Sequence, residues 1–363
     1  MPTTTRTHTA IATIAKGVVE SVQFPTSEPG PEEVVVKVAY SAIVAPDVYM
    51  VEGVLPISQE DYPVPLGISI SGLVDAVGHG VTRLKEGDRV CAFTMLEQKS
   101  KGLQTKAVLH QTLCAQIPDD LTLEAAATIP DNFVTAFYTL FNELGLPPLK
   151  AFPVISAPPG ADKPVLIYGA GATTGQYAIQ LLKLAGYTNV IATASSHNHD
   201  YLRSLGARHT IDYRSPDMAD QIIRAAGGKV ELVMDCISAE GTLKRVAQVV
   251  QSNAKVALLL PVKEGDSVIT ESGRAWMELP PDRNPFEEGV EVIGVRTFLY
   301  QENEYLKERL MPEILAQLLK DGLIQPSRIR MFDQGTFLER ALAALELMGS
   351  GKVSGEKVVV KVA

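Results

Sequence analysis

The chain has few cysteines, and none of them stands at a metal-binding spacing. Only three of its 363 residues are cysteine, Cys91, Cys114 and Cys236, and no Cys-x-x-Cys pair occurs. An odd number of widely separated cysteines argues against a disulfide scaffold and against a zinc site held by cysteines. With 46% hydrophobic residues, the chain must instead fold around ordinary apolar cores, and its length suggests about two domains.

The chain also lacks an excess of basic residues and any long apolar run. Its 33 Lys and Arg are outnumbered by 42 Asp and Glu, which gives a net charge of −9. Without a basic stripe to neutralise phosphates, a nucleic-acid partner is excluded. Residues 1–12 contain no apolar signal region, and no stretch reaches the ~18 apolar residues of a membrane span. We therefore expect a cytoplasmic protein with no membrane partner.

The most informative stretch is Lys163–Gly186. The apolar run Val165–Tyr168 predicts a buried strand, and from Gln176 onward the apolar residues follow a helical period. Between them lies the turn Gly-x-Gly-x-x-x-Gly, formed by Gly169, Gly171 and Gly175. Glycines let a backbone approach a pyrophosphate, and the start of a helix favours an anion. The order strand, glycine turn, helix predicts a dinucleotide site. The alternative is an ordinary glycine-rich turn between a core strand and a helix.

The chain on either side of this stretch divides into two patterns. The earlier part has strand-like runs such as Val34–Val38, and glycines inside Leu66–Gly78 suggest the bends of a small barrel. After Val165, strands and helices alternate, which predicts an α/β fold with a parallel, doubly wound sheet. The expected strands after the first are Val190–Thr193, Thr210–Tyr213, Val230–Met234, Val256–Leu260 and Val290–Val295. The expected helices are His199–Leu205, Ala219–Ala226 and Gly241–Gln251.

Several short motifs then resemble one family. They are Pro-Leu-Gly at 65–67, Gly-Asp-Arg-Val at 87–90, the glycine turn, and Ser-Gly-Glu-Lys-Val-Val-Val at 354–360. Together they resemble the medium-chain dehydrogenase/reductases, and most of all the zinc-independent quinone oxidoreductase and enoyl reductase branch. Ser195–Asn198 and Asp212–Arg214 are similar to the fungal trans-acting enoyl reductases that serve polyketide synthases. The resemblance implies a GroES-like β-barrel catalytic domain over 1–160 and 306–363, and a Rossmann domain over 161–305.

The positions of the zinc ligands in the family's alcohol dehydrogenases carry other residues here. The cysteine expected just before the early Asp is absent from Val44–Asp47, and the Gly-His-Glu segment corresponds to Leu66–Ile68. The four-cysteine structural lobe is absent as well, because Phe93–Leu103 contains no cysteine. Zinc needs about four such ligands held together. We therefore expect no metal.

The cofactor expected from these residues is NADPH. An acidic residue about 20 positions after the glycine turn would bind the ribose of NAD, but Ala194, Ser195 and Ser196 stand there. Small hydroxyls leave room for a 2′-phosphate, although loop serines that cap the next helix would look the same. Asn198 replaces the lysine usual in quinone reductases. Arg214 with Tyr213, or Arg203, is then the candidate basic partner.

Three residues are candidates for catalysis. Tyr49 matches a tyrosine that the family places near the nicotinamide, where a protonated phenol can donate to an enolate. A tyrosine packed at a domain edge is the alternative. Asn132 and Thr135 match a helix start that the family sets beside the nicotinamide carboxamide, although Asp131 or Asn132 may equally serve as a helix cap. The Asn that precedes the tyrosine in quinone reductases has no counterpart near Ala45.

We therefore expect an oxidoreductase that transfers hydride from NADPH to an activated C=C bond, in an α,β-unsaturated carbonyl or an enoyl thioester. The alternatives are a quinone oxidoreductase, a trans-acting enoyl reductase with a carrier-bound substrate, and a silent NADPH-binding protein. A polar excursion at Glu264–Gly289 favours a monomer over a dimer. The residues expected around the cofactor are Gly169, Gly171, Ala172, Thr173, Thr174, Gly175, Ser195, Ser196, Asn198, Tyr213, Cys236, Leu260, Val295 and Thr297.

Overall fold

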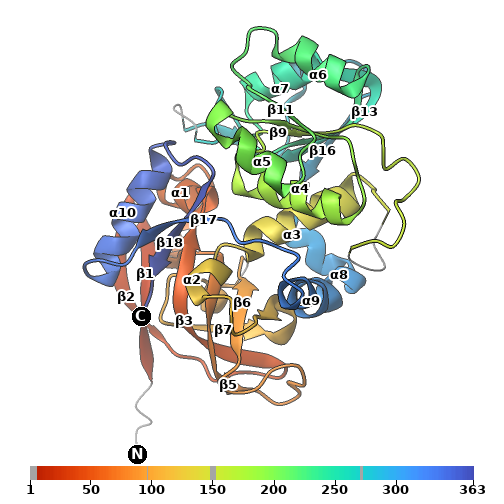
Figure 1. The fold of residues 1–363 in the computed structure, drawn as a ribbon. Helices are drawn as coiled ribbons and strands as arrows, with labels where there is room; N and C mark the ends of the chain where they lie inside the picture. The colour runs from red at the N-terminus through yellow and green to blue at the C-terminus, as the bar shows by residue number, and fades with distance from the viewer. Residues whose placement is uncertain (1–5, 96, 148–152, 270–272) are drawn as a thin grey trace, which may run out of the picture. The chain divides into compact units, whose positions relative to one another are not determined.

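A computed structural model describes residues 6–95, 97–147, 153–269 and 273–363 of the chain (Figure 1). The chain forms two compact units. One comprises Met1–Val134 and Phe298–Ala363, and we call it the barrel unit. The other comprises Thr135–Thr297, and we call it the Rossmann unit. The expected domain limits, 1–160 with 306–363 and 161–305, remain a prediction.

The Rossmann unit is built on one six-stranded parallel sheet. Its strand order is β11-β10-β9-β12-β13-β16, so the chain starts in the middle, moves to one edge and then returns to build the other half. β9 and β10 are buried along their whole length, as their apolar sequences predict. The strands are β9 (Val165–Tyr168), β10 (Val190–Thr193), β11 (His209–Ile211), β12 (Val230–Asp235), β13 (Val250–Leu259) and β16 (Glu291–Val295).

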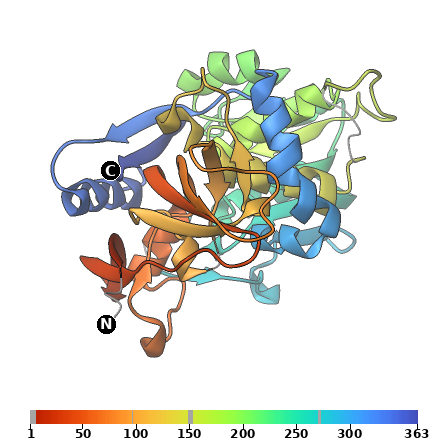
Figure 2. The ribbon, with the colours of Figure 1, turned by 90° about the horizontal axis from the view of Figure 1, so that it is seen from below.

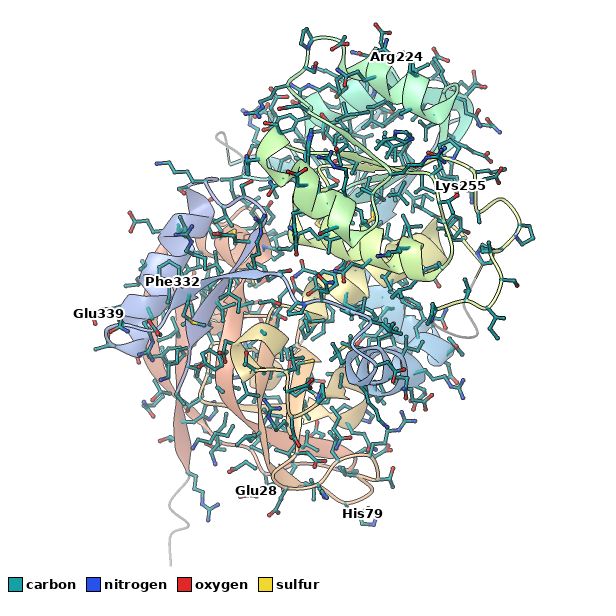
Figure 3. All side chains as sticks on the ribbon, in the orientation of Figure 1. Glu28, His79, Arg224, Lys255, Phe332 and Glu339 are labelled. Atoms are coloured by element: carbon teal, nitrogen blue, oxygen red, sulfur yellow. The ribbon has the colours of Figure 1, made fainter. Side chains whose placement is uncertain are left out.

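The helices of this unit lie between its strands in sequence. α6 (Met218–Ala226) and α7 (Glu240–Ala247) pack in one core cluster with Leu166 and Tyr168 of β9. α4 (Thr173–Leu184) contacts β9 and α5 (His199–Leu205) instead. Outer positions are polar: Lys255 of β13 pairs with Glu291 of β16 at 3.3 Å, and Figure 3 shows Lys255 and Arg224 at the surface.

The barrel unit contains a sheet with the path β17-β18-β3-β5-β6-β8, on which β7 also pairs with β3. Close strand approach requires glycine at one position: a Cβ on Gly72 of β5 would lie 2.2 Å from the carbonyl oxygen of Lys37. A smaller sheet, β2-β1-β4, belongs to the same unit. The strands are β1 (Thr7–Ala15), β2 (Val18–Pro25), β3 (Glu33–Ile43), β4 (Val64–Pro65), β5 (Ser69–Val77), β6 (Arg89–Phe93), β7 (Lys106–His110), β8 (Cys114–Gln116), β17 (Arg328–Phe332) and β18 (Glu356–Lys361).

The end of the chain completes the barrel unit. β18 pairs antiparallel with β3, and α10 (Phe337–Gly349) contacts β18 and β1. In Figures 1 and 2 these blue C-terminal segments lie beside the red N-terminal strands. The expected return of the chain to its first domain is therefore observed within this unit, with the last strand at Glu356–Lys361.

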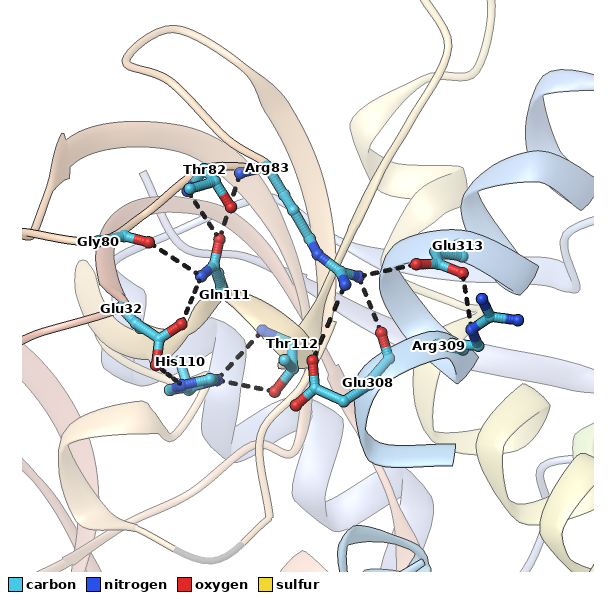
Figure 4. Close-up of polar contacts among 10 residues, drawn as sticks. All are labelled: Glu32, Gly80, Thr82, Arg83, His110, Gln111, Thr112, Glu308, Arg309 and Glu313. Carbon is cyan, nitrogen blue, oxygen red and sulfur yellow. Dashed lines mark hydrogen bonds and ion pairs between the residues drawn. The ribbon is translucent and has the colours of Figure 1, made fainter. Parts of the chain in front are cut away.

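A polar network attaches the C-terminal helical segment to the barrel strands (Figure 4). Arg83 donates to the carbonyl oxygen of Glu308 at 2.8 Å and pairs with the carboxylate of Glu313 at 3.4 Å. Gln111 accepts hydrogen bonds from the backbone of Thr82 and Arg83, which holds the loop that carries Arg83. The segment comprises α8 (Glu304–Arg309), a π-helix (Leu310–Leu315) and α9 (Ala316–Lys320).

Several expected element limits differ from the structure. The strand predicted over Thr210–Tyr213 is β11, His209–Ile211, and the strand predicted over Val256–Leu260 is β13, which begins earlier, at Val250, and ends at Leu259. The helix predicted over Gly241–Gln251 ends at Ala247, because Val250 and Gln251 already belong to β13. The helical residues between 123 and 143 form three segments, which are α2 (Leu123–Ala126), α3 (Pro130–Tyr138) and a π-helix (Thr139–Glu143). Pro130 explains one break, since proline fits the first turn of a helix but not its interior. No described helix is long and apolar enough to cross a membrane.

The Rossmann unit buries one cation, Lys263 of β14 (Val262–Lys263), which is 3% exposed. Burial lowers its pKa to about 7, against the opposing effect of Asp235. The unfolded chain, with a lysine pKa of 10.5, therefore binds more protons between pH 7 and 10.5, so this lysine makes stability rise with pH in that window. We expect Lys263→Met to remove a slope of at most about 1.4 kcal/mol per pH unit from the unfolding free energy.

Urea unfolding of the wild type and Lys263→Met at several pH values from neutral to alkaline measures this effect. The difference between the two proteins cancels the titration of tyrosines and cysteines, which they share. Parallel curves for the two proteins would contradict the lowered pKa of Lys263.

Candidate functional site

The residues predicted around the cofactor gather at one edge of the Rossmann sheet. Because all its strands are parallel, their carboxyl ends lie at the same edge. The strand order reverses between β9 and β12, where Tyr168 is registered with Asp235. In open α/β sheets this reversal point is where ligands bind. The predicted residues that end these strands or follow them within two positions are Gly169, Ser195, Tyr213, Cys236, Leu260, Val295 and Thr297.

The glycine turn after β9 is closely packed at its first and last glycines. Gly169 has φ 71°, and a Cβ there would lie 2.4 Å from Cγ1 of Ile237. A Cβ on Gly175 would lie 2.6 Å from the Cα of Ala170. The backbone of α4 therefore packs directly against the backbone of the turn. The backbone N–H of Gly169 donates to Oγ1 of Thr193 at 2.9 Å. Protein packing alone therefore requires glycine at both positions.

Gly171 differs from its two neighbours in the motif. A Cβ there would meet only Nδ2 of Asn198 at 3.4 Å and Cβ of Ala194 at 3.6 Å, which are ordinary contacts. The protein itself thus leaves room for a side chain. A ligand that approaches the backbone closely explains the glycine, as the pyrophosphate of a dinucleotide would. Ala172, Thr173 and Thr174 follow at the start of α4, a twelve-residue helix whose N-cap, Ala172, has no polar side chain.

The serines after β10 are placed differently from the asparagine that follows them. Ser195 is half-buried and Ser196 is exposed. Ser195 stands at the N-cap of a short 3₁₀ helix (Ser196–Asn198), but its side chain makes no capping hydrogen bond. Asn198 is 1% exposed and lies against the glycine turn beside Gly171. The structure therefore brings Asn198 to the turn, while Ser195 and Ser196 lie nearer the surface.

The basic candidates near these serines are held by carboxylates. Arg214 binds both carboxylate oxygens of Asp212, at 3.0 and 2.9 Å, and stacks on the ring of Tyr213. The Arg214 guanidinium holds the pKa of Asp212 well below its usual range, and the backbone N–H of Ser196 also donates to that carboxylate. Arg214 is thereby kept beside Ser196. Arg203 pairs instead with Asp200 and donates to Thr210.

The remaining residues predicted around the cofactor lie at or just after the carboxyl ends of β12, β13 and β16. Cys236 is 6% exposed, and its backbone N–H donates to the carbonyl oxygen of Tyr168 at 2.9 Å. Leu260 follows β13, and Val295 is the last residue of β16. The two strands are paired as far as Leu259 and Val295. Oγ1 of Thr297 donates to Oγ1 of Thr135 at 3.1 Å, so two of the predicted residues are in direct contact.

Sequence reasoning missed Asp235, which shapes this edge. It is fully buried, and its carboxylate accepts hydrogen bonds from the backbone N–H groups of Ile237 and Ser238 and from Oγ1 of Thr242. Burial raises the pKa of this carboxyl, although the hydrogen bonds that it accepts act to lower it. Asp235 therefore fixes the loop whose Ile237 packs against Gly169. The sequence did contain a signal for Asp235, because it is the polar residue that ends an apolar strand.

Tyr49 belongs to the barrel unit, on the short helix α1 (Ala45–Glu52). It is 2% exposed, and burial raises the pKa of its phenol above the usual value, so the proton is retained throughout the neutral range. The start of α1 is fixed by Asp47, whose buried carboxylate accepts from the backbone N–H groups of Val44 at 3.0 Å and Gly67 at 2.7 Å. Asp47 thus joins the two segments that carry zinc ligands in alcohol dehydrogenases.

Asn132 lies in the first turn of α3, also within the barrel unit. Its Nδ2 donates to the carbonyl oxygen of Thr128 at 3.0 Å and to Oδ1 of Asp131 at 3.1 Å. Asp131 lies inside α3 (Pro130–Tyr138) rather than before it, and its other oxygen binds Nζ of Lys357 at 2.5 Å. Lys357 comes from the C-terminal motif and is 3% exposed, so it is a buried partner of Asp131.

The cysteines and other metal-ligating side chains do not assemble among the described residues. No group of three or more His, Cys, Asp or Glu side chains comes together there as a metal site. Cys91, Cys114 and Cys236 are buried, and burial raises the pKa of each thiol, that of Cys114 to about 12. Buried neutral thiols are poor metal ligands.

Comparison with known proteins identifies the family. Residues 30–122 match the model of the alcohol dehydrogenase GroES-like domain, and residues 173–270 match that of the zinc-binding dehydrogenases. A protein named Dehydrogenase orf1 from Aspergillus niger is 33% identical over 94% of this chain and 94% of its own length. The chain belongs to the medium-chain dehydrogenase/reductase family.

Other members of the medium-chain dehydrogenase/reductase family carry more specific names. Trans-enoyl reductase himH from Aspergillus japonicus is 35% identical over 222 residues. The match covers 60% of this chain and 62% of that protein. Trans-enoyl reductase fsa3 from a Fusarium species is 30% identical over 81% of this chain and 82% of its own length. The crystal structure of CurK enoyl reductase shares the fold, with a TM-score of 0.75 and 22% identity over 98% of this chain and 99% of that one.

These findings confirm the expected family and fold class, a GroES-like barrel with a Rossmann sheet. They also confirm the resemblance to the fungal trans-acting enoyl reductases. The family implies an oxidoreductase with a nicotinamide cofactor, and the glycine turn fits one, because Gly171 leaves space that the protein does not fill.

The three glycines of the turn are expected to respond differently to substitution. Gly171→Ala should fold with unchanged stability but bind dinucleotide about 10-fold or more weakly, since its Cβ occupies space left for the ligand. Gly175→Ala should lower the unfolding free energy by about 1–3 kcal/mol, because its Cβ meets backbone. Fluorescence titration with NADPH and NADH, together with thermal unfolding, measures both effects. Wild-type affinity in Gly171→Ala would show that the bound dinucleotide does not lie against the backbone of this glycine.

Proposed function

We propose that this protein is an NADPH-dependent enoyl reductase that reduces the C=C bond of an enoyl thioester without a metal, in trans to a polyketide synthase. The observation that carries the proposal is the glycine turn at the reversal point of the parallel sheet, in a chain whose relatives include proteins named trans-enoyl reductase. Reduction of a free α,β-unsaturated carbonyl is the same chemistry on a smaller substrate.

The preference for NADPH is supported by the residues after β10 and β11. Ser195 and Ser196 offer hydroxyl and backbone donors where an NAD enzyme has a carboxylate. A nearby carboxylate, Asp212, accepts hydrogen bonds from Nε and Nη2 of Arg214. An arginine oriented in this way keeps N–H groups for a phosphate, to which guanidinium geometry is well matched. We assign Arg214 as the basic partner of the 2′-phosphate.

When bound, NADPH supplies the hydride that a C=C reduction needs, and the protein residues supply binding, orientation and a proton. The start of α4 and the backbone of Gly171 hold the pyrophosphate. Thr135, held by Thr297, and Asn132 orient the nicotinamide end. Tyr49 keeps its proton in the neutral range and hydrogen-bonds to the substrate oxygen as negative charge develops there.

A substrate panel tests the proposal. Purified protein is assayed for oxidation of NADPH and NADH with pantetheine-bound enoyl thioesters, 2-enals and quinones, and its metal content is measured by mass spectrometry. We expect turnover with enoyl thioesters, preference for NADPH, and substoichiometric zinc. Turnover with quinones alone would indicate a quinone oxidoreductase. Tight NADPH binding with no turnover would indicate a silent binding protein, and stoichiometric zinc would contradict the metal-free mechanism.

Tyr49→Phe is expected to lower kcat by about 100-fold, because it removes the donor to the developing enolate. NADPH affinity should stay unchanged, since the phenol does not hold the cofactor. Tyr40→Phe, at another tyrosine of the barrel unit, is the matched control and should keep wild-type kcat. Single-turnover kinetics separate the chemical step from product release. If both variants turn over at the wild-type rate, Tyr49 is a packing residue and the proton has another source.

We also propose that the protein is a monomer. The excursion Glu264–Gly289 precedes β16, and its Trp276 packs against the core of the Rossmann unit with Arg283 over its ring at 5.1 Å. Arg283 in turn binds Glu240 of α7 at 2.5 Å. The part of the excursion around Trp276 and Arg283 would then obstruct the edge of the sheet along which family members pair. Light scattering after gel filtration measures the mass directly, and a dimer would refute this part of the proposal.

A further inference from the structure

The edge of the Rossmann sheet at β11 carries a groove that the proposed reaction does not use. β11 pairs with β10 on one side and with no other described strand, so its other side is open. α5 and α6 both contact β11. The groove has a volume of about 490 Å³, and it is lined by Arg203, Arg208, His209, Thr210, Ile211, Gln221, Arg224 and Ala225.

The lining of this groove is basic, although the chain as a whole is acidic. Four of its eight residues carry a basic side chain and none carries a carboxylate, in a chain of net charge −9. Arg203 pairs with Asp200. Arg224 pairs with Asp217 at 3.5 Å, and all four side chains are about half exposed or more. Exposed ion pairs contribute little to stability, so an incoming carboxylate can replace the one that is there.

The third arginine of the groove, Arg208, has no carboxylate of its own. It is exposed and makes no ion pair within the part of the chain that the structure describes. Its charge acts at the groove, because the pKa of His209 is lowered by burial and then further by the charge of Arg208. Three arginines and the two carboxylates paired with them therefore leave one positive charge in excess.

The arginines stand over both faces of the sheet around the open edge. Oγ1 of Thr210 accepts a hydrogen bond from Arg203 of α5, whereas Ile211 packs in the core cluster that contains α6. Successive side chains of a strand point to opposite faces, so Arg203 lies over one face and Arg224 of α6 over the other. Figure 1 shows α5 and α6 on opposite sides of the sheet. Between them, the open edge presents backbone N–H and C=O groups.

We propose that this groove binds an acidic segment of a partner protein in extended conformation, as an added strand beside β11. The backbone of the segment pairs with the open edge, and its carboxylates bind Arg203 on one face and Arg224 on the other. A second copy of this chain does not fit, because its β11 edge carries the same positive charges. The inference goes beyond the proposed reaction and does not depend on it.

A synthetic peptide measures this binding directly, by fluorescence anisotropy at low salt. The probe is a fluorescein-labelled peptide with three Glu-Glu-Val-Thr repeats. One comparison peptide has Gln in place of Glu, and the other has N-methyl groups on alternate backbone nitrogens. We expect the Glu peptide to bind and each comparison peptide to bind at least about 10-fold more weakly. Equal affinity of the Gln peptide would overturn the recognition of charge, and equal affinity of the N-methylated peptide would overturn the strand pairing.

Charge reversal in the protein locates the site. Arg208→Glu combined with Arg224→Glu should weaken binding of the Glu peptide at least about 10-fold, because carboxylates then face carboxylates. Lys85→Glu combined with Lys244→Glu is the matched control, since both lysines are exposed and the net charge changes equally. Its affinity should stay within about 2-fold of the wild type, because distant surface charges are screened. Equal affinity of the groove variant and the control would overturn the proposal.

Thermal unfolding verifies that both variants are folded. If the charge-reversed groove variant does not fold, Arg208→Gln combined with Arg224→Gln takes its place, with a loss of affinity again expected. It removes the same two positive charges without adding negative ones.

Two other outcomes would assign the groove differently and overturn the proposal. If heparin binds the wild type and the Glu peptide does not, the groove recognises sulfate or phosphate groups. If neither binds, the arginines only keep the open edge from pairing with other chains. Reduction of enoyl thioesters by the same preparations is measured separately, so failure of the proposed reaction leaves the peptide result standing.

Discussion

The approach of α4 to the end of β9 constrains the rest of the Rossmann unit. At Gly175 the helix lies so near Ala170 that a single added carbon would stand 2.6 Å from the backbone. This contact directs the N-terminus of the helix at the reversal point of the sheet, where an anion gains from its N–H groups and dipole. Ile237, fixed by the buried Asp235, closes the other side of the turn at Gly169. The proposed cofactor site is therefore a consequence of backbone packing at Gly169 and Gly175.

Buried carboxylates perform a comparable task in the barrel unit. Asp47 is fully buried and joins the start of α1, which carries Tyr49, to the segment at Gly67. Asp131 joins the first turn of α3 to the last strand of the chain through Lys357. Each carboxylate satisfies donors that would otherwise be buried without partners, a loss that costs about 1–3 kcal/mol each. Charge is thus used inside this unit to hold backbone segments that lie far apart in sequence.

The sequence predicts the Rossmann unit well where one physical signal dominates. Val190–Thr193 and His199–Leu205 have the predicted limits, because a buried apolar run and a helix ended by Gly206 are local features. The helix predicted to reach Gln251 was too long, since the polar residues that begin β13 resemble a helix end and are a strand only through pairing with β12. The buried ion pair of Asp131 with Lys357 was not predictable, because the two residues are 226 positions apart. The same holds for the Asp212 carboxylate beside Ser196, which depends on the pairing of β10 with β11.

The burial of all three cysteines matters for a protein that handles conjugated carbonyl compounds. Such compounds are Michael acceptors, which alkylate thiolates. Cys91, Cys114 and Cys236 are each enclosed, and burial raises the pKa of every one of them, so the reactive anion is scarce at neutral pH. Cys236 follows β12 at the edge where the cofactor residues gather, yet it too is held as the neutral thiol. The cysteines of this chain are therefore poor nucleophiles toward the electrophiles that we assign to it as substrates.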